Sequence, residues 1–596
     1  MCGILGIMGS NLKNYSNEKI ELMLSTLSKR GPDDKGILGF PNCILGQTRL
    51  SIIDLKSGHQ PMQDNQKNIA ITYNGEIYNY RELKKKLKNK GHIFSTNSDT
   101  EVILKAYNEY GVKCLEYFEG MFAFAIWNNT KQQLFLARDR FGKKPFFYAI
   151  DENNNFIFAS EIKALFSLGT IKGVIDFEAI DNFMQLNFIP PYKTIYKNIH
   201  TLKPAHYCIV DYKNIDNITT YNYWKLGKKE INIKYDDAKE KIKSLIKKSV
   251  QKRMVSDVEV GSMLSGGVDS TLVSYLAQKH TNKPLKTFSV GFENFINELP
   301  FAKKAANKIK SDHNELIMNV NIAEELKKVY EYLDEPNADA AIIPTYLISK
   351  LAHDKNTKVL LSGDGADELF LGYGWYWSHW NIGWKHKIKN FNLFPKQFRD
   401  YLKKITYINK KERKRLWKNK KIADSKITTD YDDSKKLSDL DKINIYDLNM
   451  YLPGDLLSKI DRASMMTSVE TRAPFLDKEL VEYVYNIPTE YKTNKKKGKI
   501  ILKDILEEIM PKEFVHRGKQ GFGPPINDWL EKNEMKNLIH NSFIVSEAFI
   551  FSFLNKKHIQ KIINKFYQKC DKKYGMEIWI LLCLELWLKN NKKYHA

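Results

Sequence analysis

The chain has 596 residues, of which 43% are hydrophobic and 12% are aromatic, and this composition excludes an intrinsically disordered protein. Its length exceeds one compact core, so we expect two or three domains. The 94 basic and 70 acidic residues give a formal net charge of +24. The lysines are scattered in polar stretches without a recognised nucleic-acid motif, so we expect no nucleic-acid partner, although a basic field favours anionic ligands.

The cysteines and the apolar segments indicate a cytoplasmic protein. The six cysteines, at positions 2, 43, 114, 208, 570 and 583, form no CxxC pair and no zinc-like spacing with histidine. The N-terminus lacks the basic and apolar regions of a signal peptide. The apolar run at residues 576–588 is shorter than the roughly 20 residues that span a bilayer. We therefore expect no membrane partner and a buried C-terminal helix.

Short β-like runs dominate the chain from Cys2 to about residue 210. They lie at residues 69–73, 121–127, 133–137 and 156–160, separated by turns and two helical stretches. This pattern predicts an antiparallel sandwich flanked by helices. A polar, Asn- and Lys-rich passage at residues 211–236 then marks a boundary, which predicts a first domain at 2–210 and a second at 235–596.

Strands and helices alternate beyond this boundary. The predicted strands lie at 258–264, 285–291, 314–320 and 358–361, and the predicted helices begin at 270 or lie near 300–309 and 344–353. Such alternation predicts a doubly wound parallel sheet that binds ligands at the carboxyl ends of its strands. Residues 375–440 are aromatic, basic and irregular, and we interpret them as an insertion.

The run SGGVDS at residues 265–270 lies between a predicted strand and a predicted helix. Its two adjacent glycines allow several N–H groups to face an anion at the positive end of the helix. The lysine of a Walker A loop is missing. The run instead resembles the pyrophosphate loop of ATP-pyrophosphatases, which split ATP between the α- and β-phosphates and leave AMP on an acceptor.

Cys2 follows the initiator methionine directly. If Met1 is removed, this residue carries both a thiol and a free α-amine, whose unperturbed pKa of about 7.7 to 8.0 suits it to accept the thiol proton. One residue then supplies nucleophile and base. Any chain can have a cysteine at position 2, so Cys2 alone is weak evidence of function and the interpretation depends on the motifs that follow.

Three motifs follow Cys2 in order: Arg49 in LGQTRLSIIDL, YNGEIYN at residues 73–79, and SDTE at residues 98–101. Together they resemble class II glutamine amidotransferases, and the whole chain is similar to bacterial B-type glutamine-hydrolysing asparagine synthetases. The resemblance implies a four-layer αββα N-terminal nucleophile glutaminase, followed by an α/β ATP-pyrophosphatase domain with a helical C-terminal part. RGPDD at 30–34 and ARDRFG at 137–142 also match, and we interpret both as scaffold.

The glutaminase motifs suit the recognition of free glutamine. The fork of Arg49 suits the α-carboxylate, and Glu76 and Asp99 suit the α-ammonium group. The Asn74 side chain and the Gly75 N–H would form the oxyanion hole for the tetrahedral intermediate. The ordinary alternatives are a surface ion pair for Arg49, a hairpin turn for Asn74-Gly75 and a helix cap for Asp99, and we expect the turn to hold alongside the function.

The run LSGDGADE at residues 361–368 is predicted to open beside the SGGVDS loop. Asp269 and Asp367 would hold Mg²⁺ on the triphosphate, with a helix cap as the alternative for each. Leu264 and Val290 would contact the adenosine, or alternatively pack in the core. The residues that the resemblance assigns to ATP are Leu264, Ser265, Gly266, Gly267, Asp269, Ser270, Val290, Ser362 and Gly363.

Two further residues are assigned to the synthetase reaction by resemblance. Lys499 would meet the phosphates and help to form an acyl-adenylate, with Lys496 and Lys503 as open alternatives. Glu368 would be the general base that takes a proton from the attacking ammonia. Asp364 stands where the family often has Glu, which leaves its role open. Three more stretches, at 457–462, 469–477 and 517–523, also match the family.

The resemblance implies one reaction at two sites. Cys2 forms a γ-glutamyl thioester and releases ammonia, which follows a dry internal path to a carboxylate activated as an acyl-AMP. The acceptor is expected to be L-aspartate. However, residues 334–344 lack the Thr and Arg of the aspartate-binding stretch in well-studied asparagine synthetases, so a uronic acid from surface-polysaccharide pathways is the rival.

Other classes of protein fit less well. The intact Cys2, SGGVDS run and aspartates argue against a degenerate binding protein, and Cys2 argues against a β-lactam-forming synthetase. The expected partners are therefore small molecules, namely glutamine, Mg-ATP and a carboxylate. The sequence leaves the formation of a homodimer open.

Overall fold

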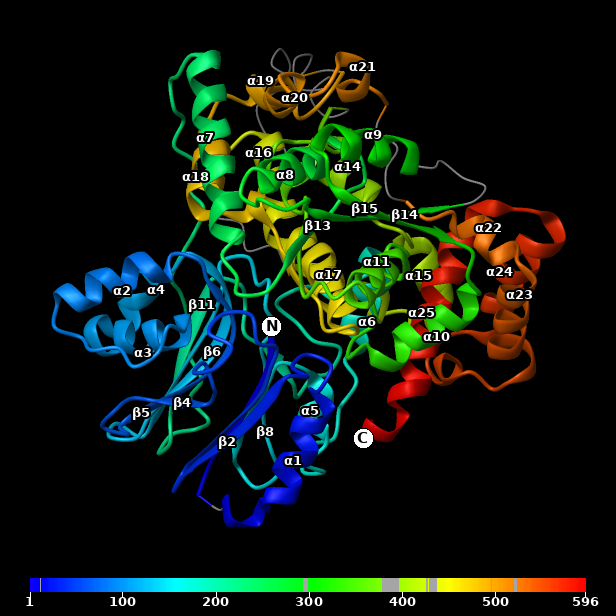
Figure 1. Ribbon diagram of the computed structural model, residues 1–596. Helices are drawn as coiled ribbons and strands as arrows, with labels where there is room; N and C mark the ends of the chain where they lie inside the picture. The colour runs from blue at the N-terminus through cyan, green and yellow to red at the C-terminus, as the bar shows by residue number, and fades with distance from the viewer. Residues whose placement is uncertain are drawn as a thin grey trace.

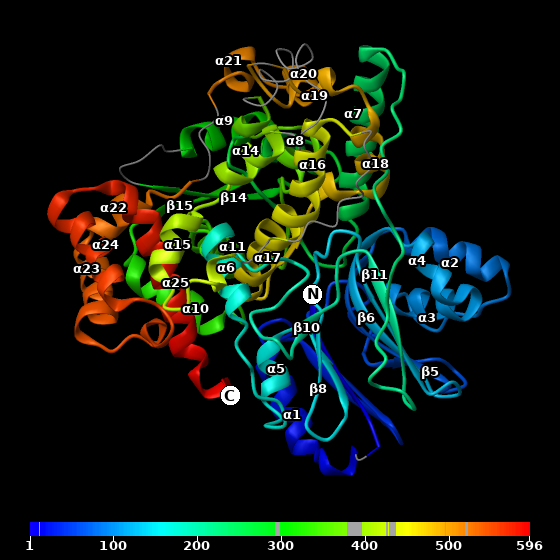
Figure 2. The same ribbon diagram turned by 180° about the vertical axis from the view of Figure 1, so that it is seen from behind.

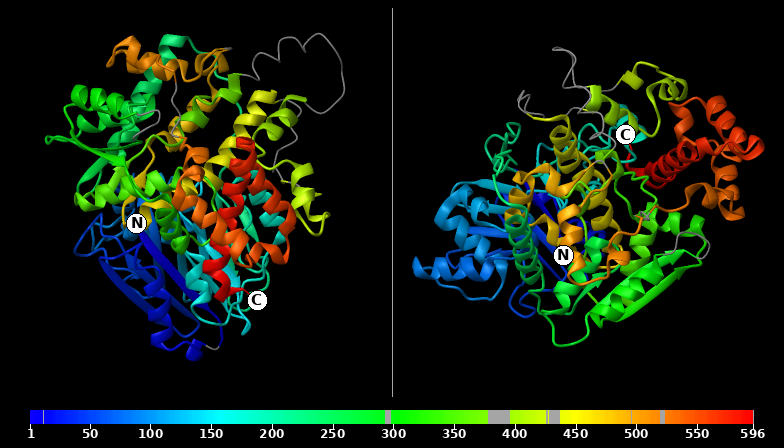
Figure 3. Two further views of the ribbon diagram at one scale, coloured as in Figure 1. Left: turned by 90° about the vertical axis from the view of Figure 1, so that its right-hand side faces the viewer. Right: turned by 90° about the horizontal axis from the view of Figure 1, so that it is seen from above.

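The computed structural model describes residues 1–10, 12–292, 298–377, 396–424, 427, 437–494, 496–518 and 523–595. It has an N-terminal β-rich domain and a larger α/β domain beside it (Figure 1). The N-terminus of the chain lies where the two domains meet, as the view from behind and the side views also show (Figures 2 and 3). The first strand therefore begins at the domain interface.

The N-terminal domain is built from two antiparallel six-stranded sheets. The first has the order β10-β8-β9-β1-β3-β2 and the second β12-β11-β7-β6-β5-β4. The strands are β1 (Cys2–Met8), β2 (Asp34–Phe40), β3 (Cys43–Arg49), β4 (Met62–Gln63), β5 (Ile69–Ile77), β6 (Gly120–Asn128), β7 (Gln133–Arg138), β8 (Phe147–Ile150), β9 (Phe156–Ala159), β10 (His200–Thr201), β11 (His206–Asp211) and β12 (Thr220–Asn222). β12 pairs with β11, so this sheet extends beyond residue 210.

Helices cover the outer faces of both sheets, which gives four layers. Along β1, Ile4 and Met8 face the core between the sheets, whereas Leu5 and Ile7 pack against the helices outside, as the period of two in a strand requires. The first sheet is covered by α1 (Asn17–Thr26) and α5 (Ile162–Phe166), and the second by α2 (Tyr80–Asn89), α3 (Asp99–Tyr110) and α4 (Cys114–Tyr117). The predicted αββα arrangement is confirmed.

The second domain contains a parallel sheet with the order β15-β14-β13-β16-β17. Its strands are β13 (Val260–Met263), β14 (Lys286–Phe292), β15 (Asp312–Met318), β16 (Val359–Leu361) and β17 (Glu470–Arg472). Val359 and Leu361 pack with α8 (Val268–Gln278) and α9 (Leu299–Ile309), whereas Leu360 packs with α11 (Ile342–Asp354). The sheet is thus doubly wound, as predicted. The strand order reverses between β13 and β16, where such sheets bind ligands.

The rest of the second domain is helical. Its other described α-helices are α7 (Tyr235–Arg253), α10 (Ile322–Tyr332), α12 (Ala366–Leu369), α14 (Lys396–Lys404), α15 (Lys410–Leu416), α16 (Asp439–Tyr446), α17 (Leu457–Met465), α18 (Lys478–Asn486), α19 (Thr489–Lys492), α20 (Ile500–Glu507), α21 (Lys512–Val515), α22 (Ile526–Glu531), α23 (Asn533–His540), α24 (Lys556–Lys569) and α25 (Gly575–Asn591). The helix α6 (Phe177–Leu186) precedes β10 in the chain but shares a hydrophobic cluster with helices of the second domain. A π-helix at Asp447–Leu456 contains Pro453, which cannot donate a backbone hydrogen bond.

Two predictions concern these helical parts. The predicted C-terminal helix is α25, most of whose side chains are buried. Among the described residues, no helix combines the length and the apolar character needed to cross a membrane. The insertion predicted at 375–440 contains α14, α15 and the start of α16, and its residues 378–395, 425–426 and 428–436 lie outside the described residues.

Candidate active site

Cys2 lies at the start of β1, in the interior of the first sheet. In the β1–β3 register Cys2 is directly opposite Arg49. The Cys2 N–H donates to Asn74 Oδ1 at 2.9 Å, and the Cys2 carbonyl accepts from Arg30 Nε at 3.2 Å. The strands therefore bring three of the predicted glutaminase residues, Cys2, Arg49 and Asn74, to one place.

The Cys2 thiol is almost fully buried, with 7% of the residue exposed. Burial raises the pKa of this thiol, while the positive N-terminus and the Arg49 guanidinium act in the opposite direction. Because the thiolate is the reactive form, this environment calls for a base beside the sulfur. The backbone nitrogen of Cys2 becomes such a base when Met1 is removed. In the full chain, the Met1 amine forms an ion pair with Glu470 at 3.1 Å.

Arg49 and Asp99, which are predicted to bind glutamine, are both buried. Arg49 Nη2 donates to the carbonyls of Ile53 and Asp54 at 2.9 and 2.8 Å, so it is not a surface ion pair. Asp99 Oδ2 accepts from the Tyr73 hydroxyl at 2.9 Å and from the Ile77 N–H at 3.0 Å. The cap of α3 is Ser98, whose side chain accepts from the N–H of Thr100. Neither ordinary alternative describes these two residues.

The expected hairpin turn at Asn74-Gly75 is wrong. Both residues lie inside β5, opposite Ala123 and Phe122 of β6. A Cβ atom on Gly75 would stand 2.1 Å from the Met121 carbonyl, so glycine is needed for the close approach of β6 rather than for a turn. Asn74 Nδ2 is buried without a hydrogen-bond partner among the described residues. A buried donor of this kind suits a developing oxyanion.

Glu76 connects the glutamine site to the second domain. Its Oε1 lies 3.2 Å from Arg472 Nη2 on β17, and Arg472 Nε donates to Glu470 at 2.7 Å. Burial raises the pKa of Glu76 strongly, and the Arg472 guanidinium opposes this effect. No role for Arg472 or Glu470 followed from the sequence. The family match at residues 469–477 was the only signal that pointed to them.

The SGGVDS loop follows β13 and ends at α8, with Gly267 as the residue before the helix. Gly266 has a positive φ of 72°, and a Cβ atom there would stand 2.5 Å from the backbone of Phe301. Arg517 Nη2 donates to the Gly266 carbonyl at 2.8 Å. This arginine therefore fixes the loop from the C-terminal part of the chain, a role that the sequence did not reveal.

The predicted adenosine contacts, Leu264 and Val290, are both buried in the domain core, with 0% and 5% exposed. Ser362 and Gly363 directly follow β16 at the neighbouring strand end. The Ser362 N–H donates to the Arg472 carbonyl at 2.9 Å. Arg472 thus contacts the glutamine site through its side chain and the predicted ATP site through its backbone.

Lys499 lies between the two predicted metal ligands. Its Nζ is 2.5 Å from Asp269 Oδ2 and 2.8 Å from Asp367 Oδ1. The two carboxylates raise the pKa of Lys499 although burial lowers it. Lys496 is exposed and Lys503 lies one turn into α20, so Lys499 is the lysine that the structure brings to the aspartates.

These aspartates fit Mg²⁺. Since one ammonium nitrogen contacts both carboxylates, one cation of similar reach can contact both, and hard oxygen donors suit this ion. Within the described residues, no group of three or more His, Cys, Asp or Glu converges on one point. The protein would thus supply two ligands, with phosphate and water as the others, as is common for Mg²⁺.

The two remaining carboxylates of the LSGDGADE run differ in exposure. Glu368 is 1% exposed and accepts from the Tyr373 hydroxyl at 2.6 Å. Burial, together with the charge of Asp367, raises the pKa of Glu368 to about 8. Asp364 is half-buried and accepts from Ser362 Oγ at 2.7 Å. Both carboxylates are therefore held in place, but only Glu368 is removed from water.

A buried charge cluster lies near these carboxylates. Lys459 Nζ is 2.5 Å from Asp339 Oδ2, and Asp455 Oδ1 accepts from Asn337 Nδ2 at 3.2 Å. Burial and the neighbouring Asp339 raise the pKa of Asp455 to about 7. The ring of Tyr451 borders this cluster, and it packs 5.9 Å from the ring of Tyr373. The sequence analysis did not find this cluster, because its members lie far apart in the chain.

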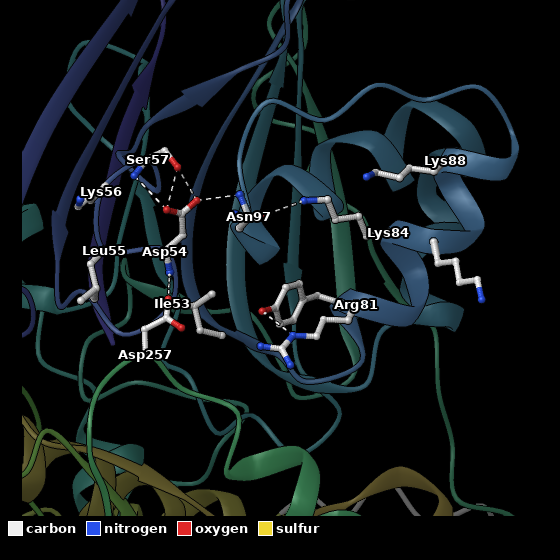
Figure 4. Close-up of a pocket in the computed structure, with 12 residues that line it drawn as sticks. Ile53, Asp54, Leu55, Lys56, Ser57, Arg81, Lys84, Lys88, Asn97 and Asp257 are labelled. Atoms are coloured by element: carbon white, nitrogen blue, oxygen red, sulfur yellow. Dashed lines mark hydrogen bonds between the residues drawn. The ribbon is translucent and has the colours of Figure 1, made fainter.

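An open cavity of about 820 Å³ lies beside the segment that holds Arg49 (Figure 4). Asp54 accepts from the N–H groups of Ser57 and Asn97, and its own N–H donates to Asp257 at 2.7 Å. The residues that line this cavity are Ile53, Asp54, Leu55, Lys56, Ser57, Tyr80, Arg81, Lys84, Lys85, Lys88, Asn97 and Asp257. Because Asp257 belongs to the second domain, both domains fix the segment that orients Arg49.

Comparison with known proteins agrees with this arrangement. The family model described as glutamine amidotransferase domain matches residues 1–224, and the one described as asparagine synthase matches residues 241–589. Asparagine synthetase (glutamine-hydrolyzing) 1 of Bacillus subtilis strain 168 is 33% identical, with 100% of this chain and 98% of the relative covered. Asparagine synthetase (glutamine-hydrolyzing) 3 of the same organism is 32% identical, with 91% of each covered. This chain therefore belongs to the asparagine synthase family, as a ligase with an N-terminal glutamine amidotransferase domain.

Proposed function

We propose that this protein uses the amide nitrogen of glutamine to convert a carboxylate into an amide, with L-aspartate as the acceptor and L-asparagine as the product. ATP is split into AMP and pyrophosphate in the same cycle. The observation that carries the proposal is that one chain holds two separate sets of reactive groups. Cys2 lies beside Asn74, whose Nδ2 has no hydrogen-bond partner among the described residues, and Lys499 lies between Asp269 and Asp367.

The first half of the reaction takes place at Cys2. The α-amine of the processed chain removes the thiol proton, and the sulfur attacks the amide carbon of glutamine. Asn74 Nδ2 and the Gly75 N–H stabilise the oxyanion. Arg49 binds the α-carboxylate, and Glu76 with Asp99 binds the α-ammonium group. The intermediate collapses to a γ-glutamyl thioester and ammonia, and water then releases glutamate.

The second half takes place at the ends of β13 and β16. Asp269 and Asp367 would hold Mg²⁺, which offsets the negative charge of the triphosphate when it is bound. Lys499 stabilises the charge that develops as the acceptor carboxylate displaces pyrophosphate from the α-phosphorus. Ammonia then attacks the acyl carbon of the acyl-AMP, Glu368 takes a proton from the nitrogen, and AMP leaves. The half-buried Asp364 is the alternative base.

The buried charge cluster supports aspartate over a uronic acid. Lys459 supplies a cation for an α-carboxylate. Residues 334–344 contain no arginine that could supply this cation. Asp339 and Asp455 supply anions for an α-ammonium group. A uronic acid carries no ammonium group, so it would offer these two carboxylates no cation in exchange for the water that it displaces. The uronic acid remains the second candidate because the family match does not fix the acceptor.

We also propose the cytoplasm as the location of this reaction. All six cysteines are free thiols in the structure, five of them buried and Cys570 exposed. Reduced thiols are typical of cytoplasmic proteins.

The decisive experiment supplies the processed protein with glutamine, Mg-ATP and one carboxylate at a time. We expect L-aspartate to give equal amounts of AMP, pyrophosphate and amide, the amide being identified by mass spectrometry. D-Glucuronate is the test of the rival acceptor, and a reaction without any carboxylate measures uncoupled glutamine hydrolysis. Formation of ADP and phosphate instead of AMP and pyrophosphate would contradict the proposed chemistry for every acceptor.

A further inference from the structure

Lys143 is a lysine of the glutaminase domain that lies at the interface with the second domain. It belongs to the loop after β7, which is fixed by the Asp139 carboxylate. This carboxylate accepts from the N–H groups of Phe141, Lys143 and Lys144, each at 3.0 Å. The backbone at Lys143 is thus held rigidly, and its side chain has a defined place.

The side chain of Lys143 is buried and has no hydrogen-bond partner among the described residues. The residue is 5% exposed, and its Nζ finds no partner in the part of the chain that the structure describes. The neighbouring Lys144 differs, because its Nζ lies 3.4 Å from Asp461. A buried, unpaired ammonium group is costly, so the neutral amine is favoured. Burial, with a further contribution from Lys144, lowers the pKa of Lys143 to about 7.

Lys143 lines a small cavity between the domains. The cavity has a volume of about 40 Å³ and is lined from the first domain by residues such as Lys143 and Pro190, and from the second by Gly454, Ser458 and Asp461. This volume holds a molecule of the size of water, and ammonia has that size. It is far below the roughly 300 Å³ or more of typical sites for larger ligands.

Residues that line the cavity are linked by contacts to both sets of reactive groups. On the glutaminase side, Arg30 donates to the Cys2 carbonyl at 3.2 Å and to Asp461 Oδ2 at 2.9 Å, and Asp461 lines the cavity. On the synthetase side, Asp364 is close enough to Lys143 for its charge to act on the ammonium group. Contacts therefore connect the region of Lys143 with Cys2 on one side and with Asp364 on the other.

We propose that Lys143 selects the form of nitrogen that crosses between the two sites, by admitting neutral ammonia and excluding ammonium. This inference rests on the proposed function. As a cation, Lys143 repels ammonium strongly, because the interaction between charges is stronger where one of them is buried, as Lys143 is. As a neutral amine, it offers one lone pair and two N–H groups, which match the hydrogen bonds of ammonia. Only neutral ammonia is a nucleophile for the acyl-AMP.

Lys143→Met tests this role, because methionine fills similar space without the amine. Lys193→Met is the matched control. Lys193 lines the same cavity, but it is partly exposed and forms an ion pair with Glu178 at 3.3 Å. Each protein is given unlabelled glutamine, Mg-ATP and L-aspartate in a solution of ¹⁵N-ammonium. The measured quantities are amide formed per glutamine hydrolysed and the ¹⁵N fraction of the amide.

For Lys143→Met we expect the amide formed per glutamine to fall at least threefold and the ¹⁵N fraction to rise. Glutamine hydrolysis and ammonia-dependent synthesis should each stay within twofold of wild type, and Lys193→Met should match wild type throughout. Lys143→Gln, measured in parallel and checked by circular dichroism, gives the same test if the methionine variant does not fold.

An unchanged amide-to-glutamine ratio and ¹⁵N fraction in both variants would overturn the proposal. A higher KM for the carboxylate with glutamine and with ammonia alike would also overturn it, because Lys143 would then be an acceptor-binding residue. A wild-type protein that makes no amide from either nitrogen source would instead overturn the proposed function, and the role of Lys143 with it.

Discussion

The two domains position their reactive groups in different ways. In the glutaminase domain, Cys2 and Arg49 lie opposite each other on the paired strands β1 and β3, and the Asn74 side chain on β5 of the other sheet accepts from the Cys2 N–H. In the synthetase domain, Asp269, Asp367 and Lys499 come from three separate segments, and ion pairs join them. The first set is therefore preorganised by backbone structure, whereas the second depends on a balance of charge. This difference predicts which substitutions damage each activity.

The largest expected effect is that of Cys2→Ala. The strand that carries Cys2 does not need the sulfur, so the fold and the synthetase site should persist. We expect glutamine-dependent amide formation to fall at least about 1,000-fold, as for the loss of other catalytic nucleophiles, with ammonia-dependent synthesis unchanged. Steady-state assays with each nitrogen source measure both. Loss of both activities in a folded variant would contradict the separation of the two sites.

Asp367→Asn tests the reactive groups of the synthetase domain, which ion pairs hold together. Asparagine has the same shape but leaves Lys499 with one carboxylate fewer and weakens any Mg²⁺ site. We expect pyrophosphate release with aspartate to fall about 100-fold, similar to the loss of one strong electrostatic contact in other active sites. Glutamine hydrolysis by the same protein is the internal control and should change less than twofold. An equal loss of both activities would indicate a structural role for Asp367.

Arg472 contacts both the glutamine site and the predicted ATP site. We therefore expect its substitution to change activity by a smaller factor than Cys2→Ala or Asp367→Asn. Arg472→Gln leaves the buried Glu76 without its cation. The guanidinium opposes the rise in the pKa of Glu76 that burial causes, so its loss should raise that pKa further and increase the protonated fraction of Glu76. We expect the KM for glutamine to rise about tenfold, the equivalent of about 1.4 kcal/mol.

The pH dependence separates this cause from a general distortion of the site. Because Glu76 binds the α-ammonium group as a carboxylate, the KM of Arg472→Gln should fall again as the pH rises and Glu76 ionises. Arg472→Lys, which keeps the charge, should lie between the variant and wild type. A raised KM that stays constant with pH would show that Arg472 acts on the glutamine site by another route.

The sequence predicted the layers of both domains and the groups within each site better than the contacts between the domains. Cys2 and Arg49 were identified from motifs, and their cross-strand pairing followed from the fold. The Asn-Gly pair was misread as a turn, because glycine also allows close backbone approach inside a sheet. The roles of Arg472 and Lys143 were not predicted, because segments that are distant in the sequence decide whether a charged side chain has a partner. Local patterns do not record such pairings.

The smallest expected effect is a change in the free energy of unfolding, which the buried side chain of Lys143 lowers. Its pKa of about 7 in the folded protein lies well below the value of about 10.4 in an unfolded chain. The folded protein therefore binds fewer protons than the unfolded chain between these values, so the free energy of unfolding rises with pH across this window. The cost is complete below pH 7, where a buried ammonium group would have to be accommodated. It disappears as the pH approaches 10.

Lys143→Met removes this cost. We expect the variant to raise Tm by about one to a few degrees at pH 7, and by less at pH 9.5, as measured by scanning calorimetry. The methionine also changes apolar packing, but that contribution does not depend on pH, so the difference between the two gains isolates the charge. Lys193→Met should show no such difference. Equal gains at both pH values would mean that Lys143 carries its charge in the fold without penalty, which its burial without a partner argues against.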